Sequence, residues 1–142
     1  MTVDRLPAGW TNIKLSDAGN WTGGGTPSKS NQDYRCGSIP WVSPKDMKAG
    51  NIAKTKDQIT ENTIINSSAK LIPASSVLMA TRSGILAHSF PVATNSVEVA
   101  INQDLKAIVP IEAIDSEYLA WLLRSDSRSI LNQCTKQGRG RL

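Results

Sequence analysis

The chain has one histidine and two cysteines among its 142 residues, and these shortages exclude several kinds of site. Cys36 and Cys134 form no CxxC pair, and His88 has no cysteine or histidine at metal-ligand spacing, so we expect no zinc site. A lone histidine without a nucleophile motif also argues against triad catalysis. Two isolated cysteines indicate reduced thiols in a cytoplasmic protein.

Long apolar runs and targeting signals are missing as well. No segment approaches the roughly 20 apolar residues that a membrane-spanning helix requires. Residues 1–5 lack the cationic and apolar regions of a signal peptide. We therefore expect no contact with a membrane.

Signatures of enzymatic chemistry are also absent. The glycines at 23–25 fit neither the GxxxxGKS/T nor the GxGxxG arrangement, and no glycine-rich turn opens a helix to hold a methyl donor. Residues 39–42 do not resemble the Asn/Asp-Pro-Pro-Tyr/Phe pattern of adenine methyltransferases, and no Glu-x-Lys follows Asp46 as a nuclease would need. The sequence predicts a protein that is not an enzyme and binds no cofactor.

What is present suits one folded domain. Hydrophobic residues make up 39% and charged residues 20%, as in ordinary globular chains. The net charge of +4 favours polyanionic partners, although a solvated basic surface without function explains it equally well. The basic residues form two clusters, one of Lys45, Lys48, Lys54 and Lys56 and one of Arg124, Arg128, Lys136, Arg139 and Arg141.

Hydrophobic periodicity predicts an α+β fold, in which a twisted, largely antiparallel or mixed sheet has flanking helices. Residues 22–38 are rich in Gly, Ser, Thr and Asn and predict a long loop. Strands are expected at 10–15, 39–42, 77–80, 86–94, 97–101 and 107–110.

Helices are expected at 60–69, from Asp115 or Ser116 onward, and at 129–137. The four tryptophans divide by their surroundings in the sequence. Their large apolar area predicts that Trp10, Trp41 and Trp121 lie in the core, whereas Trp21 beside the loop is expected to be exposed.

Several short motifs occur in a fixed order along the chain. They are Leu6-Pro7-Ala8-Gly9-Trp10, Gly24-Gly25-Thr26-Pro27-Ser28, Ile39-Pro40-Trp41-Val42-Ser43-Pro44-Lys45-Asp46-Met47, Ala80-Thr81-Arg82-Ser83-Gly84 and Ile101-Asn102-Gln103-Asp104-Leu105. The series resembles the target recognition domain of type I restriction-modification specificity subunits. The resemblance implies a domain over residues 1–138 and a tail over 139–142, where a spacer helix is expected.

The resemblance also implies a function and partners. Such a domain recognises double-stranded DNA and reads one half of a bipartite target, while separate methylation and restriction subunits carry the chemistry. An alternative is an interaction protein that uses the same scaffold to bind the methylation subunit without reading DNA.

Four segments supply the candidate DNA contacts. Thr26, Ser28 and Lys29 are expected to donate to phosphates, although a glycine-rich turn is often only backbone geometry. Ser43, Lys45, Asp46 and Lys48 form the second group, in which Lys45 would bind a phosphate or guanine and Asp46 a cytosine amino group. The alternative for this group is a solvated turn with a Lys45–Asp46 surface pair.

The last two candidate segments each follow a predicted strand. The third group is Thr81, Arg82 and Ser83. The guanidinium of Arg82 suits bidentate recognition of guanine, and the alternative is that it satisfies carbonyls in the turn at Gly84. Gln103 suits adenine, with a polar turn as the alternative.

The chain departs from the family pattern in carrying one recognition domain without the long spacer helices. We expect an excised N-terminal domain or a truncated gene product that is monomeric. Without the spacer, it is not expected to recruit methylation subunits stably.

Overall fold

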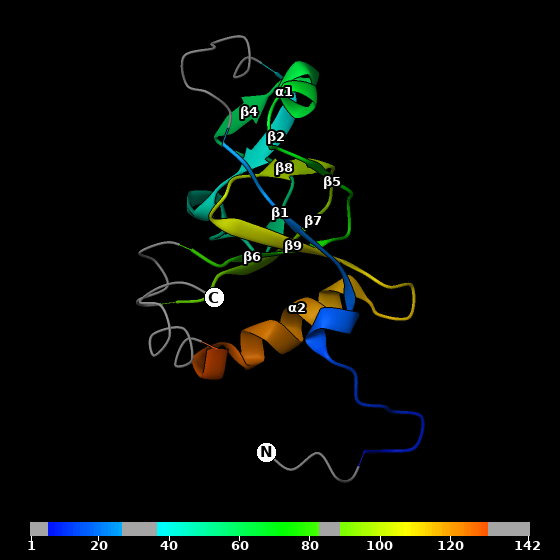
Figure 1. Cartoon of the computed structure of the whole chain (residues 1–142). Helices are drawn as coiled ribbons and strands as arrows, with labels where there is room; N and C mark the ends of the chain where they lie inside the picture. The colour runs from blue at the N-terminus through cyan, green and yellow to red at the C-terminus, as the bar shows by residue number, and fades with distance from the viewer. Residues whose placement is uncertain (1–5, 27–36, 83–88, 131–142) are drawn as a thin grey trace.

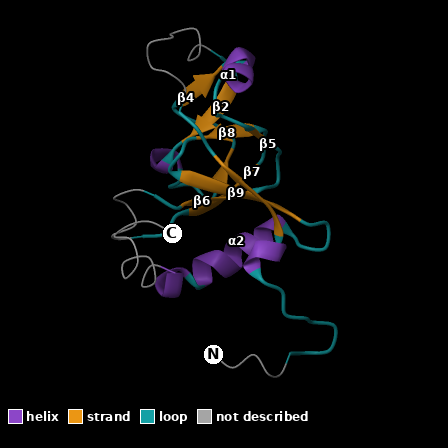
Figure 2. Ribbon diagram, in the orientation of Figure 1, coloured by secondary structure: helices purple, strands orange, loops and turns teal. Residues whose placement is uncertain are grey.

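The computed structural model describes residues 6–26, 37–82 and 89–130, and two β-sheets dominate it (Figures 1 and 2). The large sheet has the strand order β1 (Gly19–Gly23), β9 (Leu105–Pro110), β6 (Val77–Ala80), β7 (Val92–Asn95) and β3 (Asn51–Ile52). The small sheet has the order β4 (Asp57–Ile59), β2 (Ile39–Val42), β8 (Val99–Ile101) and β5 (Leu71–Ile72). Most neighbouring strands are antiparallel, but β2 pairs with β8 and β3 with β7 in parallel, which makes both sheets mixed.

Two α-helices and two short 3-10 helices complete the described fold. The helices are α1 (Glu61–Asn66) and α2 (Ser116–Ser125), and the 3-10 turns are η1 (Leu15–Asp17) and η3 (Pro44–Asp46). Both α-helices begin where a side chain accepts from the backbone, at Thr60 for α1 and at Asp115 for α2. The α+β class and the mixed sheet predicted from the sequence are confirmed.

One apolar core joins the two sheets. Every residue of β6, Val77–Ala80, is buried, because the strand lies in the centre of the large sheet with neighbours on both sides. Val42 and Ile101 of the small sheet belong to the same core as Leu78 and Ile108 of the large sheet. The large sheet is covered on its other face by α2, which contacts β6 and β7 and lies on the side away from the small sheet (Figure 1).

The predicted strand at 10–15 is wrong. Residues 10–14 pair with no strand, η1 follows, and the actual strand is β1, which occupies residues placed partly in the predicted loop at 22–38. Alternation of apolar and polar residues indicated half-burial, yet Trp10 and Ile13 remain 58% and 51% exposed. The strand forms at Gly19–Gly23 instead because the edge of β9 is available there for pairing.

The tryptophan prediction is correct for two residues and wrong for two. Trp41 is buried at 6% exposure and Trp21 is 38% exposed, as expected, but Trp121 and Trp10 are largely exposed. Trp121 lies on the outer side of α2, because the side chains that meet the sheet are Leu119, Ala120 and Leu123.

The remaining boundaries differ mainly in length. The helix expected at 60–69 ends at Asn66, and the strand expected at 86–94 is β7 at Val92–Asn95. Residues 127–130 are helical, but most of the helix predicted at 129–137 and the tail at 139–142 lie outside the described residues. The short strands β3, β4 and β5 carry too little periodicity to be found from sequence.

Candidate nucleic-acid interface

The sheet topology brings four separate segments to one edge of the molecule. Because β2 and β8 are parallel, they end together, and the Asn102 backbone N–H donates to the Val42 carbonyl at 3.0 Å. Strand β6 ends beside the start of β9, where the N–H groups of Thr81 and Arg82 donate to the Asp104 carbonyl at 2.8 and 3.1 Å. We call this region the convergent edge; it comprises residues 24–26, 43–48, 81–82 and 102–106.

Glycines bring the first of these segments against the fourth. The Gly25 N–H donates to the Ile101 carbonyl at 3.1 Å, and the Trp41 indole donates to the Gly25 carbonyl at 3.3 Å. A Cβ on Gly24 would collide with the carbonyl oxygens of Ile101 and Asn102. The glycines are therefore needed for close approach of two backbones within the protein.

Thr26 and Gln103 meet across the convergent edge. Both are exposed, and the Thr26 hydroxyl donates to the Gln103 side-chain oxygen. The predicted polar turn at Asn102 is confirmed, since its side chain accepts from the Asp104 N–H at 3.0 Å. The turn therefore presents Gln103 outward while Asn102 closes it.

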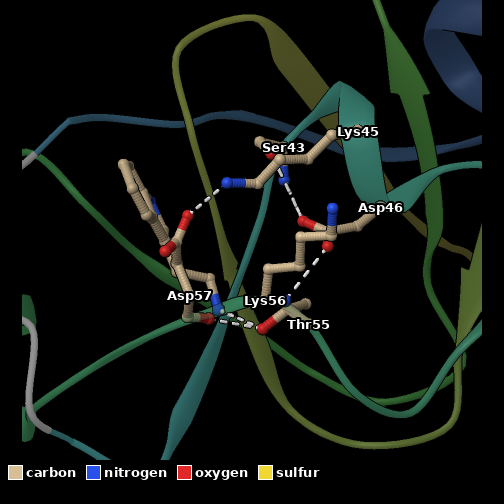
Figure 3. A network of polar contacts seen from close by, with 7 residues as sticks. Ser43, Lys45, Asp46, Thr55, Lys56 and Asp57 are labelled. Carbon is tan, nitrogen blue, oxygen red and sulfur yellow. Dashed lines mark hydrogen bonds and ion pairs between the residues drawn. The ribbon is translucent and has the colours of Figure 1, made fainter.

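Asp46 braces the loop that carries Lys45 (Figure 3). One of its carboxylate oxygens accepts from the Ser43 N–H and hydroxyl at 3.0 and 3.3 Å, and the other accepts from the Lys56 N–H at 3.2 Å. Ser43 is only 9% exposed. Both side chains are engaged within the protein, so we assign them to positioning the loop rather than to contact with bases.

Lys45 pairs with Asp57, not with Asp46 as the surface-pair alternative had it. Its ammonium lies 2.6 Å from the Asp57 carboxylate, and Figure 3 shows the side chain extending away from Asp46 towards β4. The two side chains are 47% and 37% exposed. An exposed pair of this kind contributes little stability, so little free energy is lost when Lys45 leaves Asp57.

Thr81 and Arg82 of the Thr81–Ser83 group differ in their exposure to solvent. Thr81 is buried at 4% exposure, and its contact with DNA stays a prediction. Arg82 is exposed, and its guanidinium makes no hydrogen bond or ion pair with any residue of the described ranges. Ser83 lies outside the described residues, as do Ser28 and Lys29.

Basic side chains outnumber acidic ones around the convergent edge. Exposed lysines and an arginine on or beside it are Lys45, Lys48, Lys56, Arg82 and Lys106. The acids nearby are Asp46, Asp57 and Asp104, and the first two are already engaged. Lys106 was not among the predicted contacts. Its charge within the otherwise apolar strand β9 indicates a side chain that points to solvent, and it lies opposite Gly23 in the strand register.

Comparison with known proteins identifies the family. Residues 7–142 match the model of the type I restriction modification DNA specificity domain. The chain belongs to this family. Members of the family are the specificity components of type I restriction-modification systems, and these components are not the catalytic ones.

Two curated specificity subunits illustrate the relationship. The chain is 42% identical over 125 residues to the type I restriction enzyme EcoR124I/EcoR124II specificity subunit of Escherichia coli, covering 87% of this chain and 31% of that protein. It is 30% identical over 130 residues to the MjaIX specificity subunit of Methanocaldococcus jannaschii, covering 89% and 29% respectively. The chain thus spans less than a third of these relatives.

Solved structures share the fold of this specificity domain. The HsdS subunit from Thermoanaerobacter tengcongensis superposes with a TM-score of 0.66 at 18% identity, over 97% of this chain and 33% of that one. A chain from a study of complex assembly and conformational transition of the type I R-M system gives 0.68 at 18% identity, over 97% and 34%.

The second basic cluster of the specificity domain has a structural role at Arg124. Its guanidinium donates to the Val92 carbonyl at 3.2 Å and to the Gly50 carbonyl at 3.1 Å, and it lies 5.3 Å from the Trp121 ring centroid. Arg124 therefore ties α2 to the large sheet. Lys136, Arg139 and Arg141 lie outside the described residues.

The described part of the domain holds no group of three or more His, Cys, Asp or Glu side chains suited to a metal ion. No helix within it is both long and apolar enough to span a bilayer.

Proposed function

We propose that this specificity domain recognises double-stranded DNA and reads one half of a bipartite target for methylation and restriction subunits. It would act in the cytoplasm, on genomic DNA. The observation that carries the proposal is the convergent edge of a member of a DNA specificity family. An exposed glutamine and several lysines meet there with an arginine whose guanidinium has no partner among the described residues. The domain is proposed to span residues 1–138.

The geometry assigns different roles to these side chains. Arg82 is proposed to read guanine, because its guanidinium has no partner among the described residues and its fork of donors matches the guanine edge. Gln103, steadied by Thr26, is the second proposed base reader. Lys45, Lys48 and Lys106 are proposed to bind phosphates, which fixes position without reading sequence. Ser28, Lys29 and Ser83 stay proposed contacts from the predicted set.

Fluorescence anisotropy of a labelled DNA duplex, measured at two ionic strengths, tests the proposal. The isolated chain should bind with a dissociation constant in the micromolar range or weaker, because it has half of a recognition surface. Between about 50 and 200 mM salt the affinity should fall steeply, since phosphate contacts release counterions. Arg128→Gln, in the helical residues 127–130, is the control for Arg82→Gln, because both remove one exposed positive charge.

Three results would count against the proposal. They are no binding at low salt, binding that salt does not change, and equal losses from Arg82→Gln and Arg128→Gln. Binding to the methylation subunit without any binding to DNA would instead support the alternative interaction protein.

A further inference from the structure

A small apolar pocket opens beside the convergent edge. Its volume is about 390 Å³, and it lies between the turn η3 and the residues that lead into β7. Apolar side chains make up most of its lining, namely Pro44, Met47, Phe90 and Pro91. Met47 and Phe90 are nearly buried, at 5% and 6% exposure, so the pocket reaches the apolar core of the domain.

The walls of this pocket are fixed by the fold. On one side, the Met47 N–H donates to the Pro44 carbonyl at 3.1 Å. On the other side, the Pro91 carbonyl accepts from the Ala80 N–H at 3.3 Å. Met47 and Phe90 also belong to the core that joins the two sheets. A ligand therefore meets a preformed surface, and little further free energy is spent on ordering the protein.

Two lysines stand at the pocket. Lys45 and Lys48 line it, and both side chains are exposed. They are three residues apart, in η3 and just after it, and residues at this spacing lie on the same side of a 3-10 turn. Among the described residues, no acidic side chain lines the pocket, and Ser89 at its mouth is neutral and exposed. An apolar hollow beside two cations suits a ligand with an apolar centre and anionic groups on either side.

The larger groove on the small sheet has a different character. Its volume is about 630 Å³, and it is lined by Glu61 and Glu98 with a single lysine, Lys54. Two carboxylates repel a polyanion. The charge at the mouth, and not the size of the hollow, therefore distinguishes the small pocket as a site for nucleic acid.

The sugar-phosphate backbone of DNA matches the small pocket. Base edges lie within a groove and are reached by protruding side chains, whereas the backbone projects from the duplex and can enter a hollow. Each deoxyribose is a carbon-rich ring between two phosphates. A ribose carries in addition a 2′-hydroxyl, by which proteins tell RNA from DNA. In an apolar pocket this hydroxyl loses its hydrogen bonds to water and finds no partner.

We propose that the pocket holds one deoxyribose of the DNA backbone, with Lys45 and Lys48 on the two flanking phosphates, and that it discriminates DNA from RNA. The inference rests on the proposed function, since it assigns a further contact to the same DNA. The hydrogen bond between Ala80 and Pro91 places the pocket next to the end of β6, two residues before Arg82. A backbone seated in the pocket therefore runs along the convergent edge.

The test measures binding of three duplexes of one sequence to the whole 142-residue chain by fluorescence anisotropy at low salt. One duplex is DNA, one has ribose in both strands, and one has 2′-fluoro-2′-deoxyribose in both strands. The last two share the A-form helix and the phosphate charge and differ in the hydroxyl. DNA should bind most tightly. The ribose duplex should bind at least about fivefold more weakly than the 2′-fluoro duplex, because its hydroxyl is desolvated without a partner.

Two pairs of variants locate this discrimination. Met47→Gln brings an amide that can pair with the hydroxyl, and should reduce the difference between the ribose and 2′-fluoro duplexes to less than about twofold. Met79→Gln is the matched control, because Met79 is 2% exposed in the same core but does not line the pocket. Pro91→Ser and Pro110→Ser form a second pair at half-buried prolines, in case the glutamines perturb folding, which circular dichroism checks. Lys48→Gln should weaken all three duplexes by similar factors.

Equal affinities for the ribose and 2′-fluoro duplexes, or no binding of the 2′-fluoro duplex, would overturn the inference, because charge or helix form alone would then decide. The same holds if the control variants change the discrimination as much as the pocket variants do. Tighter binding of a mismatched DNA duplex would assign the pocket to an extruded base instead, since a mismatched base leaves the stack more easily. If DNA binds without discrimination, only the inference fails. If no duplex binds, the proposed function fails with it.

Discussion

At the scale of single residues, neighbours in the sequence have opposite roles. Lys45 and Asp46 are adjacent, yet Lys45 extends to Asp57 on β4 while Asp46 turns back to Ser43 and the Lys56 backbone. From residue type alone, both were predicted to contact DNA. Only the direction of each side chain separates the solvated cation from the carboxylate that holds the loop.

The two aspartates should therefore differ in their contribution to stability. Asp46→Ala removes acceptors from partly buried donors and should lower the free energy of unfolding by about 1–2 kcal/mol. Asp57→Ala removes an exposed ion pair and should cost less than about 1 kcal/mol. Urea denaturation followed by tryptophan fluorescence measures both, and an equal cost would contradict the bracing role of Asp46.

Arg82 and Lys45 should differ in how they affect DNA binding. Arg82→Ala should cost about 1–3 kcal/mol of binding free energy and relax specificity at one base pair, because a bidentate base contact is lost. Lys45→Ala should weaken all sequences alike and reduce the salt slope by about one unit. The assay needs a full specificity subunit carrying each change. Sequence-independent losses from both variants would remove Arg82 from the base-reading set.

At the scale of elements, the segment after β1 shows why glycine is required at only some positions. Strand β1 ends at Gly23, where an added Cβ would meet nothing within 4 Å. One residue later, Gly24 lies directly against the backbone of the Ile101–Asn102 turn. The same residue type is thus dispensable at one position and required at the next.

Gly24→Ala should destabilise the domain by about 1–3 kcal/mol, as overpacking against fixed backbone does. Gly23→Ala is the matched control and should change the free energy of unfolding by less than about 0.5 kcal/mol, because its surroundings are open. Thermal and urea unfolding of the pair measure the difference. If Gly24→Ala unfolds like Gly23→Ala, residues 24–26 do not pack against the turn as described.

At the scale of the whole molecule, charge and apolar surface are separated. Exposed basic side chains gather at the convergent edge, whereas the exposed aromatic side chains of Trp10, Tyr118 and Trp121 lie on the N-terminal segment and α2. The total composition does not show this separation.

The isolated chain should remain a monomer despite its exposed tryptophans. Nothing in the sequence continues a heptad seam through which the C-terminal helices of two copies could pair. Light scattering at micromolar concentration should therefore give the monomer mass of 15.3 kDa. A stable dimer would contradict this and would show that the exposed apolar side chains pair two copies.

The sequence by itself determined the local features whose cause is local. The apolar run Val77–Ala80 is a central strand, Thr60 and Asp115 begin helices, and Pro44 ends the extension of Ile39–Val42. The order of short motifs likewise identified the family, since it is carried by residue types and not by their positions in space.

Tertiary structure decided everything that depends on which segments meet. Strand β1 forms at Gly19–Gly23 because β9 offers a partner there, and Trp121 is exposed because the sheet takes the other face of α2. Parallel pairing of β2 with β8 brings the segments of the convergent edge together. The fold leaves Lys45 and Arg82 exposed, whereas their sequence neighbours Asp46 and Thr81 are hydrogen-bonded within the loop and buried, respectively. A pattern in one segment records its own preferences, whereas pairing and burial depend on the free energy of contacts with residues far away in the chain.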